Sequence, residues 1–196
     1  ALLYWNRVLK RVDLTSRSMA APVEHGSCFA GMLAELLFAV DRSYMMLDEF
    51  DSDNRPLATI TLSDANFGRY PMSNGITRLE TRFLGEPETL KSQTNAALDA
   101  EAADELGLVT FAFDDVDWED EVRIFLEERA SFSPDAMTAM EANLRFAGPE
   151  TMETRIFGRL TAWQNWVFQR PNAVGPDGAL QRYGTGVRAE FNQERV

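Results

Sequence analysis

Histidine and cysteine are nearly absent from this chain of 196 residues, which has one of each. A zinc site built on several histidines is therefore excluded, and a Ser-His-Asp triad would depend on His25 alone. With Cys28 alone no internal disulfide can form, which fits a reducing compartment, and we predict a cytoplasmic location. Cys28 and His25 could act as nucleophile and base, but we expect a small buried thiol and a hydrogen-bonded histidine at a strand end.

Positive charge is also scarce. The chain has 19 Lys and Arg against 31 Asp and Glu, a formal net charge of −12. Binding to nucleic acid or to an anionic membrane surface needs clustered basic residues, so we predict neither partner. No apolar run is long enough to span a bilayer, and no signal peptide pattern opens the chain.

The chain lacks an initiating methionine and begins inside a helical pattern. Apolar residues recur at i, i+3, i+4 and i+7 from Trp5, which predicts an amphipathic helix. We therefore expect this chain to be the C-terminal part of a longer protein. Arg7, Lys10 and Arg11 share another face of that helix, and we interpret them first as a solvated face.

Strand and helix alternate in the first half. APVEH (residues 21–25), DRSYMML (41–47) and LVTFAF (108–113) are typical of strands, and the small residues of GSCFAG (26–31) predict a tight turn. A helix is expected over residues 32–40. This order predicts an α/β fold with at least some parallel pairing.

A helix is expected over about residues 87–98, before the strand predicted over 108–113. The chain after that strand is predicted to be helical. Ser-Pro-Asp at 133–135 is a strong start signal there, with Ser as N-cap and Pro at the first position. A Gly- and Pro-rich tail ends the chain. We predict an α/β domain over residues 1–130, followed by a helical extension and tail over residues 131–196.

Three motifs in register resemble the crotonase (enoyl-CoA hydratase/isomerase) superfamily. H-G-S-C-F-A-G-M-L-A-E-L-L-F-A-V-D resembles the family's rough pattern N-G-x-x-x-G-G-G-x-E-L-A-x-x-x-D, and Glu35 and Asp41 keep the six-residue offset of the family's Glu and Asp. S-D-A-N-F-G-R-Y-P-M-S-N-G-I-T-R-L matches P-E-x-x-x-G-x-x-P-x-x-G-G-x-x-R-L and places Asp64 at the family's second acid. A-E-A-A-D-E-L-G-L-V (100–109) resembles A-x-x-A-x-x-x-G-L-V.

The resemblance implies a crotonase-like α/β fold, a spiral of β-β-α units, here lacking the N-terminal strands and carrying a helical C-terminal extension. In that family two backbone N–H groups hold a thioester carbonyl, and Gly31 matches the turn that supplies one of them. Glu35 and Asp64 match the acids that handle protons or water. No metal and no cofactor is implied, because the substrate carries coenzyme A. The basic face near Arg7 could meet its phosphates.

Further segments, among them NRVLKRVDLTSRS, MEANLRFAGPETMETRIFGRL and YGTG, resemble the double-length crotonase-type lyases of aerobic benzoate breakdown. The implied reaction opens the ring of 2,3-dihydro-2,3-dihydroxybenzoyl-CoA, or its epoxide equivalent, and releases formate. The implied partners are the N-terminal part of the same enzyme and a second copy in a homodimer. A generic enoyl-CoA hydratase/isomerase is the remaining choice of enzyme.

Alternatives stay open for the singled-out residues. The family's Gly triplet reads A-G-M-L here, which is typical of a degenerate second copy. In that case Glu35 is a buried structural acid bonded to backbone or to an arginine, Asp64 is a turn or cap residue, and this half serves packing and dimerisation. The acids over residues 48–53 are a cation site or, as we prefer, a solvated loop. Trp163 and Trp166 form a ligand box or, as we prefer, a subunit or interdomain contact.

Overall fold

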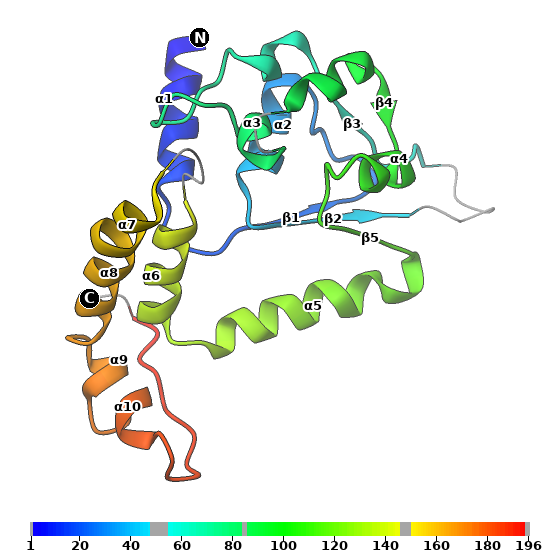
Figure 1. Cartoon of the computed structure of the whole chain (residues 1–196). Coiled ribbons are helices and arrows are strands. Elements are labelled where there is room, and N and C mark those ends of the chain that lie inside the picture. Colours follow the sequence, from blue (N-terminus) through cyan, green and yellow to red (C-terminus); the bar gives the residue numbers. More distant parts are fainter. Residues whose placement is uncertain (1, 48–54, 84–85, 146–149, 195–196) are drawn as a thin grey trace. The chain divides into compact units, whose positions relative to one another are not determined.

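The computed structural model describes residues 2–47, 55–83, 86–145 and 150–194 (Figure 1). The acidic loop predicted over residues 48–53 lies outside these ranges. The chain divides into two compact units: unit 1 comprises Ala1–Asp13 and Met19–Leu126, and unit 2 comprises Leu14–Ser18 and Glu127–Val196. Among the described helices, none is both long enough and apolar enough to cross a membrane.

Unit 1 alternates short strands and helices, as the sequence predicts. Its elements are α1 (Leu2–Asp13), β1 (Ala20–Val23), η1 (Gly31–Leu33), α2 (Ala34–Ala39), β2 (Arg42–Met46), β3 (Ile60–Thr61), η2 (Asp64–Phe67), α3 (Arg78–Arg82), η3 (Pro87–Gln93), β4 (Ala97–Leu98), α4 (Ala100–Glu105), β5 (Phe111–Phe113) and the greater part of α5 (Asp115–Ser131).

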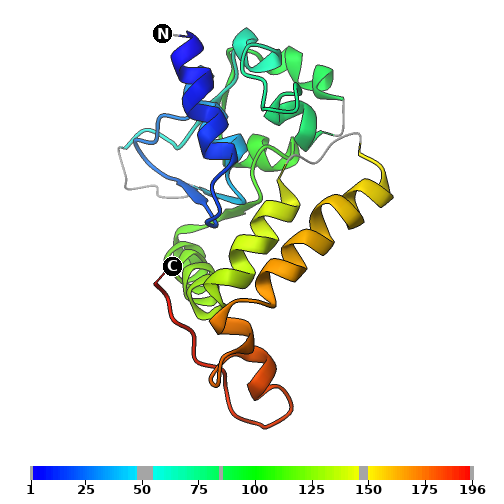
Figure 2. The same ribbon diagram turned by 90° about the vertical axis from the view of Figure 1, so that its left-hand side faces the viewer.

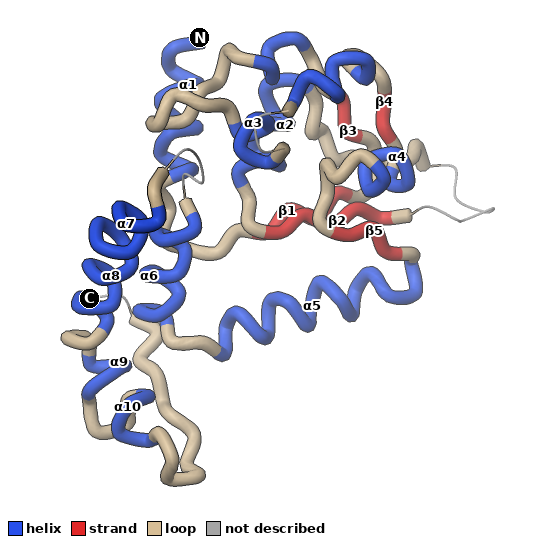
Figure 3. Tube along the Cα trace, in the orientation of Figure 1, coloured by secondary structure: helices blue, strands red, loops and turns tan. Residues whose placement is uncertain are grey.

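A parallel sheet in the order β1-β2-β5 forms the centre of unit 1 (Figure 3). Ala21 pairs with Ser43, and Tyr44 pairs with Phe111. The crossover from β1 to β2 passes through α2, so the predicted parallel pairing is confirmed. β1 ends at Val23 because the chain then turns, with the Ser27 N–H donating to the Glu24 carbonyl at 3.0 Å.

The helix predicted over residues 87–98 is wrong in its second half. A 3₁₀ helix, η3, ends at Gln93, and Asn95 takes a positive φ of 65°. The Asn95 N–H donates to the Leu62 carbonyl at 2.8 Å, and β4 then pairs antiparallel with β3. The long-range pairing therefore overrides the local helical pattern.

The main core of unit 1 lies between the sheet and its helices. It contains the fully buried side chains of Val23, Leu37, Met45, Ile60 and Leu79, among others. A smaller cluster joins Tyr44 of β2 to Trp118 and Phe125 of α5, with the Tyr44 and Phe125 rings 5.7 Å apart. Burial on both sides explains why the predicted strand over 41–47 is rich in large apolar residues.

Unit 2 is helical. It contains the end of α5, α6 (Pro134–Leu144), α7 (Met152–Arg155), the π-helical turn η4 (Ile156–Leu160), α8 (Thr161–Val167), α9 (Pro171–Val174) and α10 (Ala179–Arg182). Figure 2 shows α6 beside the helix made of α7, η4 and α8. The Ser133 hydroxyl accepts from the Ala136 N–H at 3.4 Å, so the predicted start of α6 is confirmed.

Asp135 and Asn172 hold the C-terminal tail onto unit 2. The Asp135 carboxylate accepts from Arg170 Nε at 3.1 Å and from Asn172 Nδ2 at 2.9 Å. The Asn172 amide also pairs with both backbone groups of Asn192, at 3.0 and 2.8 Å. The tail is thus fixed by hydrogen bonds to a buried side chain.

Leu79 and Leu3 offer a matched test of the core of unit 1. Leu79 is 0% exposed, whereas Leu3 on α1 is 84% exposed. We expect Leu79→Ala to lower the free energy of unfolding by about 2–5 kcal/mol, because it leaves a cavity. Leu3→Ala should change it by less than about 0.5 kcal/mol. Urea unfolding followed by circular dichroism measures both, and equal losses would contradict this placement of the core.

Candidate functional site

Glu35 is completely buried on the first turn of α2. The remaining side chains of that helix are apolar and pack into the core. The carboxylate of Glu35 is buried because it lies on the same helix. Each carboxylate oxygen accepts one hydrogen bond: Oε1 from Asn66 Nδ2 at 2.7 Å and Oε2 from Arg78 Nη1 at 2.9 Å. Glu35 is therefore a paired internal acid.

Arg78 carries the positive charge that meets Glu35. It lies on α3, is 2% exposed, and also binds Asp13 at the end of α1 in a bidentate way, at 2.9 and 2.6 Å. Its Nη1 also donates to the Tyr70 carbonyl at 3.1 Å. One guanidinium thus bridges two buried carboxylates and joins α1, α2 and α3.

Asn66 connects Glu35 to the turn at Gly31. Its Nδ2 donates both to Glu35 and to the Gly31 carbonyl, the latter at 2.9 Å. Its Oδ1 accepts from the backbone N–H and the hydroxyl of Ser63, at 2.9 and 3.1 Å. The amide is 0% exposed and has all of its hydrogen bonds satisfied. We call Asp13, Glu35, Asn66 and Arg78 the Glu35 network.

The pKa of Glu35 is raised above its ordinary value of 4.5. Burial is the largest cause, because a low-dielectric interior disfavours the ionised carboxylate. The hydrogen bond from Asn66 and the charge of Arg78 lower the pKa, and the negative charge of Asp13 raises it again. Arg78 is shared with Asp13, so its charge compensates Glu35 only in part.

Gly31 occupies a position that requires glycine. It begins η1 with a φ of 49°, and a Cβ atom there would lie 3.3 Å from Ser63 Oγ. Its carbonyl accepts from Asn66 and from the Ala34 N–H. The structure therefore places the predicted thioester-binding turn directly against the Glu35 network.

Asp64 lies outside the Glu35 network. It is exposed in the first turn of η2, and within the described part of the chain its carboxylate has no hydrogen-bond or ion-pair partner. Asn66, two residues later, is the residue of η2 that reaches Glu35. The structure thus brings Gly31 and Glu35 together and leaves Asp64 apart.

Sequence analysis missed Asp13, Asn66 and Arg78. Ser63 and Asn66 form a capping box, a pattern readable from their spacing. Arg78 is the arginine of the T-R-L motif quoted above for its family likeness. Its pairing with Asp13, far away in sequence, had no local signal.

Cys28 is exposed, so the predicted buried thiol is wrong. It lies in the turn after β1, where the chain leaves the sheet instead of packing into the core. His25 Nδ1 lies 3.0 Å from the Pro56 carbonyl, as expected of a hydrogen-bonded residue just past a strand.

The two tryptophans of α8 contact each other and an arginine. The Trp163 and Trp166 rings are 5.5 Å apart and nearly perpendicular, and the Arg170 guanidinium lies 5.0 Å from the Trp166 ring centre. Trp166 therefore has a cation–π partner within its own unit. The predicted subunit or interdomain contact stays a prediction.

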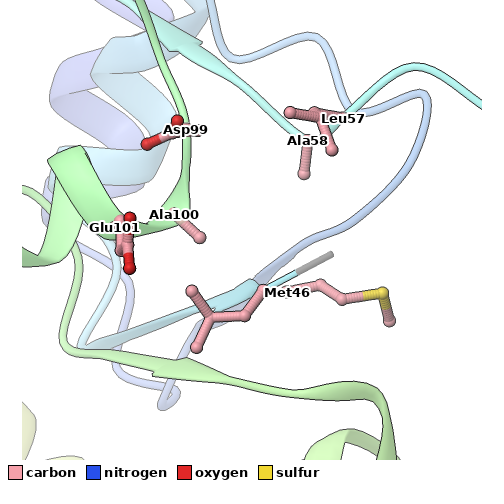
Figure 4. Close-up of a pocket in the computed structure, with 7 residues that line it drawn as sticks. Met46, Leu57, Ala58, Asp99, Ala100 and Glu101 are labelled. Atoms are coloured by element: carbon pink, nitrogen blue, oxygen red, sulfur yellow. The ribbon is translucent and has the colours of Figure 1, made fainter. Parts of the chain in front are cut away.

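A cavity of about 230 Å³ lies at the carboxyl end of β2 (Figure 4). Ligands of open parallel sheets bind at such strand ends. Its lining residues include Met46, Leu57, Ala58, Asp99, Ala100 and Glu101. No member of the Glu35 network lines it, so the cavity and the network are separate features. Among the described residues no group of His, Cys, Asp or Glu is placed to hold a metal ion.

No protein-family model matches the chain. The chain is 53% identical over 193 residues to a benzoyl-CoA-dihydrodiol lyase of Aromatoleum evansii, a match that covers 97% of this chain and 34% of that protein. It therefore spans about a third of the length of that relative.

Solved structures show the fold. An enoyl-CoA hydratase of Geobacillus kaustophilus matches with a TM-score of 0.69 at 18% identity, over 97% of this chain and 67% of that one. An enoyl-CoA hydratase of Thermoplasma volcanium matches with a TM-score of 0.64 at 17% identity, over 87% of this chain and 62% of that one. The predicted crotonase-like α/β fold is confirmed.

The raised pKa of Glu35 predicts how stability depends on pH. The folded state holds this proton more tightly than the unfolded state, so its contribution to stability falls as pH rises from 4.5 through the folded-state pKa. Glu35→Gln removes this component. Both partners of Glu35 are hydrogen-bond donors, so the NH₂ group of the glutamine must face one of them. We therefore expect Glu35→Gln to lower the free energy of unfolding by about 1–3 kcal/mol at acidic pH.

The gap in unfolding free energy between the wild type and Glu35→Gln should therefore narrow as pH rises. Urea unfolding at a series of pH values from about 4 to 8 measures it. Glu105→Gln, at an exposed position of α4, is the matched control. Its difference in unfolding free energy from the wild type should not change with pH. A Glu35 gap that widens with pH would show that the pKa of Glu35 is lowered instead.

Gly31→Ala should lower the free energy of unfolding by about 1–2 kcal/mol, because an L side chain is strained at positive φ. The new Cβ would also press on Ser63 Oγ. Gly158→Ala in η4 is the control, since φ is not positive there and nothing lies within 4 Å of the added atom. Thermal unfolding compares the two, and an equal effect would contradict the glycine requirement at Gly31.

Proposed function

We propose that this chain, which has the crotonase fold, works as part of a CoA-thioester lyase. The supporting observation is its 53% identity over 193 residues to a benzoyl-CoA-dihydrodiol lyase. The proposed reaction is the hydrolytic ring opening of 2,3-dihydro-2,3-dihydroxybenzoyl-CoA, or of its epoxide equivalent, with release of formate. The partners are the CoA-thioester substrate, the remaining part of the enzyme and a second copy in a homodimer. We place the reaction in the cytoplasm, with no metal or redox cofactor.

Within that enzyme we assign this chain a supporting role, as a degenerate second crotonase copy. The observation that carries this role is the state of Glu35. A general acid or base must reach the proton that it transfers. Glu35 is fully buried, and both of its oxygens are held by Asn66 and Arg78. Its carboxylate thus stabilises the packing of helices instead of meeting a substrate.

The Gly31 turn supports the same interpretation. A crotonase-type site needs a backbone N–H aimed at the thioester oxygen, with room for the substrate beside it. Here the residue after Gly31 is Met32, at a position where the family pattern has glycine. The large side chain of Met32 is 51% exposed. Asn66 fixes the turn from inside by binding the Gly31 carbonyl. The turn is therefore held from its inner side by a hydrogen bond, and its outer side carries a bulky side chain.

One observation favours the second candidate, in which this half also does chemistry. Asp64 is exposed at the position of the family's second acid, so its carboxylate is accessible to a substrate. In that case Asp64 would transfer a proton or activate water while Glu35 remains a positioning residue. The two candidates differ in what Asp64→Asn does to turnover.

The test is formate release from the dihydrodiol thioester by the complete enzyme carrying Asp64→Asn or Glu35→Gln. We expect Asp64→Asn to keep turnover within about threefold, since losing a general acid or base costs about a hundredfold or more. Glu35→Gln should lower the melting temperature but leave kcat per folded molecule unchanged. Asp104→Asn, at an exposed position of α4, is the control.

Other outcomes would overturn a specific part of the proposal. A drop of a hundredfold or more in Asp64→Asn at an unchanged melting temperature would make this half catalytic. A wild-type enzyme that releases no formate but hydrates crotonyl-CoA would replace the lyase by a generic enoyl-CoA hydratase.

A further inference from the structure

The helix made of α7, η4 and α8 exposes a row of large apolar side chains. The row has a member at every fourth position from residue 152 to residue 168, and Gln164 is its single polar member. Scattered exposed apolar residues are normal, whereas a contiguous patch of them marks an interaction surface. Five apolar side chains in or beside the row are between 38% and 73% exposed, and we call them the Phe157 face: Met152, Ile156, Phe157, Leu160 and Phe168.

The π-helical turn η4 helps to keep this row on one side of the helix. In a regular α-helix, residues four apart drift by about 40° around the axis, because 3.6 residues make one turn. In η4 the turn is wider, since the Thr161 N–H donates to the Ile156 carbonyl five residues earlier. The wider turn reduces the drift between Ile156 and Leu160. Such turns are rare and are frequent at functional sites.

The polar side of the same helix is fixed to α6. Arg155 Nη1 donates to the Asn143 carbonyl at 3.4 Å. Arg159 Nη1 donates to the Arg145 carbonyl at 2.5 Å. Both Arg155 and Arg159 also pair with Glu150, each at 3.3 Å. Figure 2 shows the helix lying beside α6. The helix is therefore held by its polar side, and its apolar side is left exposed.

The Phe157 face is nearly free of charge. The helix over residues 152–167 has three charged residues, and two of them are the arginines paired with Glu150. Within the described residues, Glu153 is the only charged residue of this helix without an ion pair. The whole chain has a formal net charge of −12, so two copies repel each other over most of their surfaces and least at this face.

The size and composition of the face fit the core of a dimer contact. At roughly 200 Å² for a fully exposed side chain of this size, the five exposed fractions amount to on the order of 500 Å². Stable interfaces bury about 800 Å² on each partner, with a core rich in aromatic residues and Met and a polar rim. Glu153, Gln164 and Asn165 are exposed next to the face and can supply that rim.

We propose that the Phe157 face is the contact between two copies of this chain, related by a two-fold axis. A two-fold contact places the same surface on both sides, so an apolar and nearly uncharged face is complementary to its own copy. A partner recognised by charge would need an oppositely charged surface to meet. The proposal names the surface of the homodimer in the proposed function, and it rests on that part alone and not on the lyase reaction.

The test is the mass of the complete enzyme in solution, measured by size-exclusion chromatography with light scattering over a range of concentrations. Leu160→Glu places two charges in each dimer contact, so the dissociation constant of the dimer should rise by about a hundredfold or more. Leu180→Glu in α10 is the matched control, because Leu180 is 50% exposed and Leu160 is 51% exposed. The control should leave the dissociation constant unchanged, and circular dichroism checks that both variants fold.

Pairs of opposite charge test whether the face meets its own copy. Phe157→Glu combined with Leu160→Glu should give a monomer, and so should Phe157→Lys combined with Leu160→Lys. Mixing the two double variants should restore a dimer with one copy of each, because opposite charges then face each other across the contact. Native mass spectrometry identifies the mixed dimer by its mass.

The outcomes separate this proposal from the proposed function. A dimeric wild type whose dissociation constant is unchanged in Leu160→Glu, or double variants that form no mixed dimer, would overturn the Phe157 contact and leave the homodimer standing. A monomeric wild type would overturn both. If Leu160→Glu then lowered the melting temperature and Leu180→Glu did not, the remaining part of the enzyme would be the occupant of the face. Formate release is measured separately, so a failed lyase proposal does not affect this test.

Discussion

The arrangement of unit 1 around Gly31 depends on one buried cation. Arg78 is 2% exposed and is bound by Asp13, Glu35 and the Tyr70 carbonyl, which come from three different parts of the chain. A buried charge that loses one partner is strongly unfavourable, so α1, α2 and α3 must stay in register around the guanidinium. Asn66 extends the same constraint to the Gly31 carbonyl.

This constraint is consistent with the supporting role proposed for Glu35. The resemblance matches Glu35 to an active-site acid, but its surroundings satisfy both oxygens within the core. A fold carries many functions, and the chemistry of a position follows from its partners and its access to substrate. The crotonase fold of this chain and the supporting role proposed for it are therefore compatible.

Buried charges are paired in both units. In unit 1 Arg78 is paired with Asp13 and Glu35, and burial raises the pKa of Glu35 by more than Asn66 and the shared Arg78 lower it. In unit 2 the buried carboxylates of Asp135 and Glu141 are paired with Arg170 and Arg145. The net charge of the chain, from which we predict no nucleic acid partner, thus says little about the surroundings of a particular buried charge.

The sequence by itself determined the features that have local causes. These are the parallel α/β order, the start of α6 at Ser133, and the motifs that indicate the crotonase fold, because periodicity, capping and turn residues act over a few positions. Only the tertiary structure decided the pairing of Arg78 with Asp13 across 65 residues, the role of Asn66, and the replacement of a predicted helix end by β4. Each of these depends on which distant segments meet in the core, and a contact between distant segments leaves no periodic pattern in the residues around either partner.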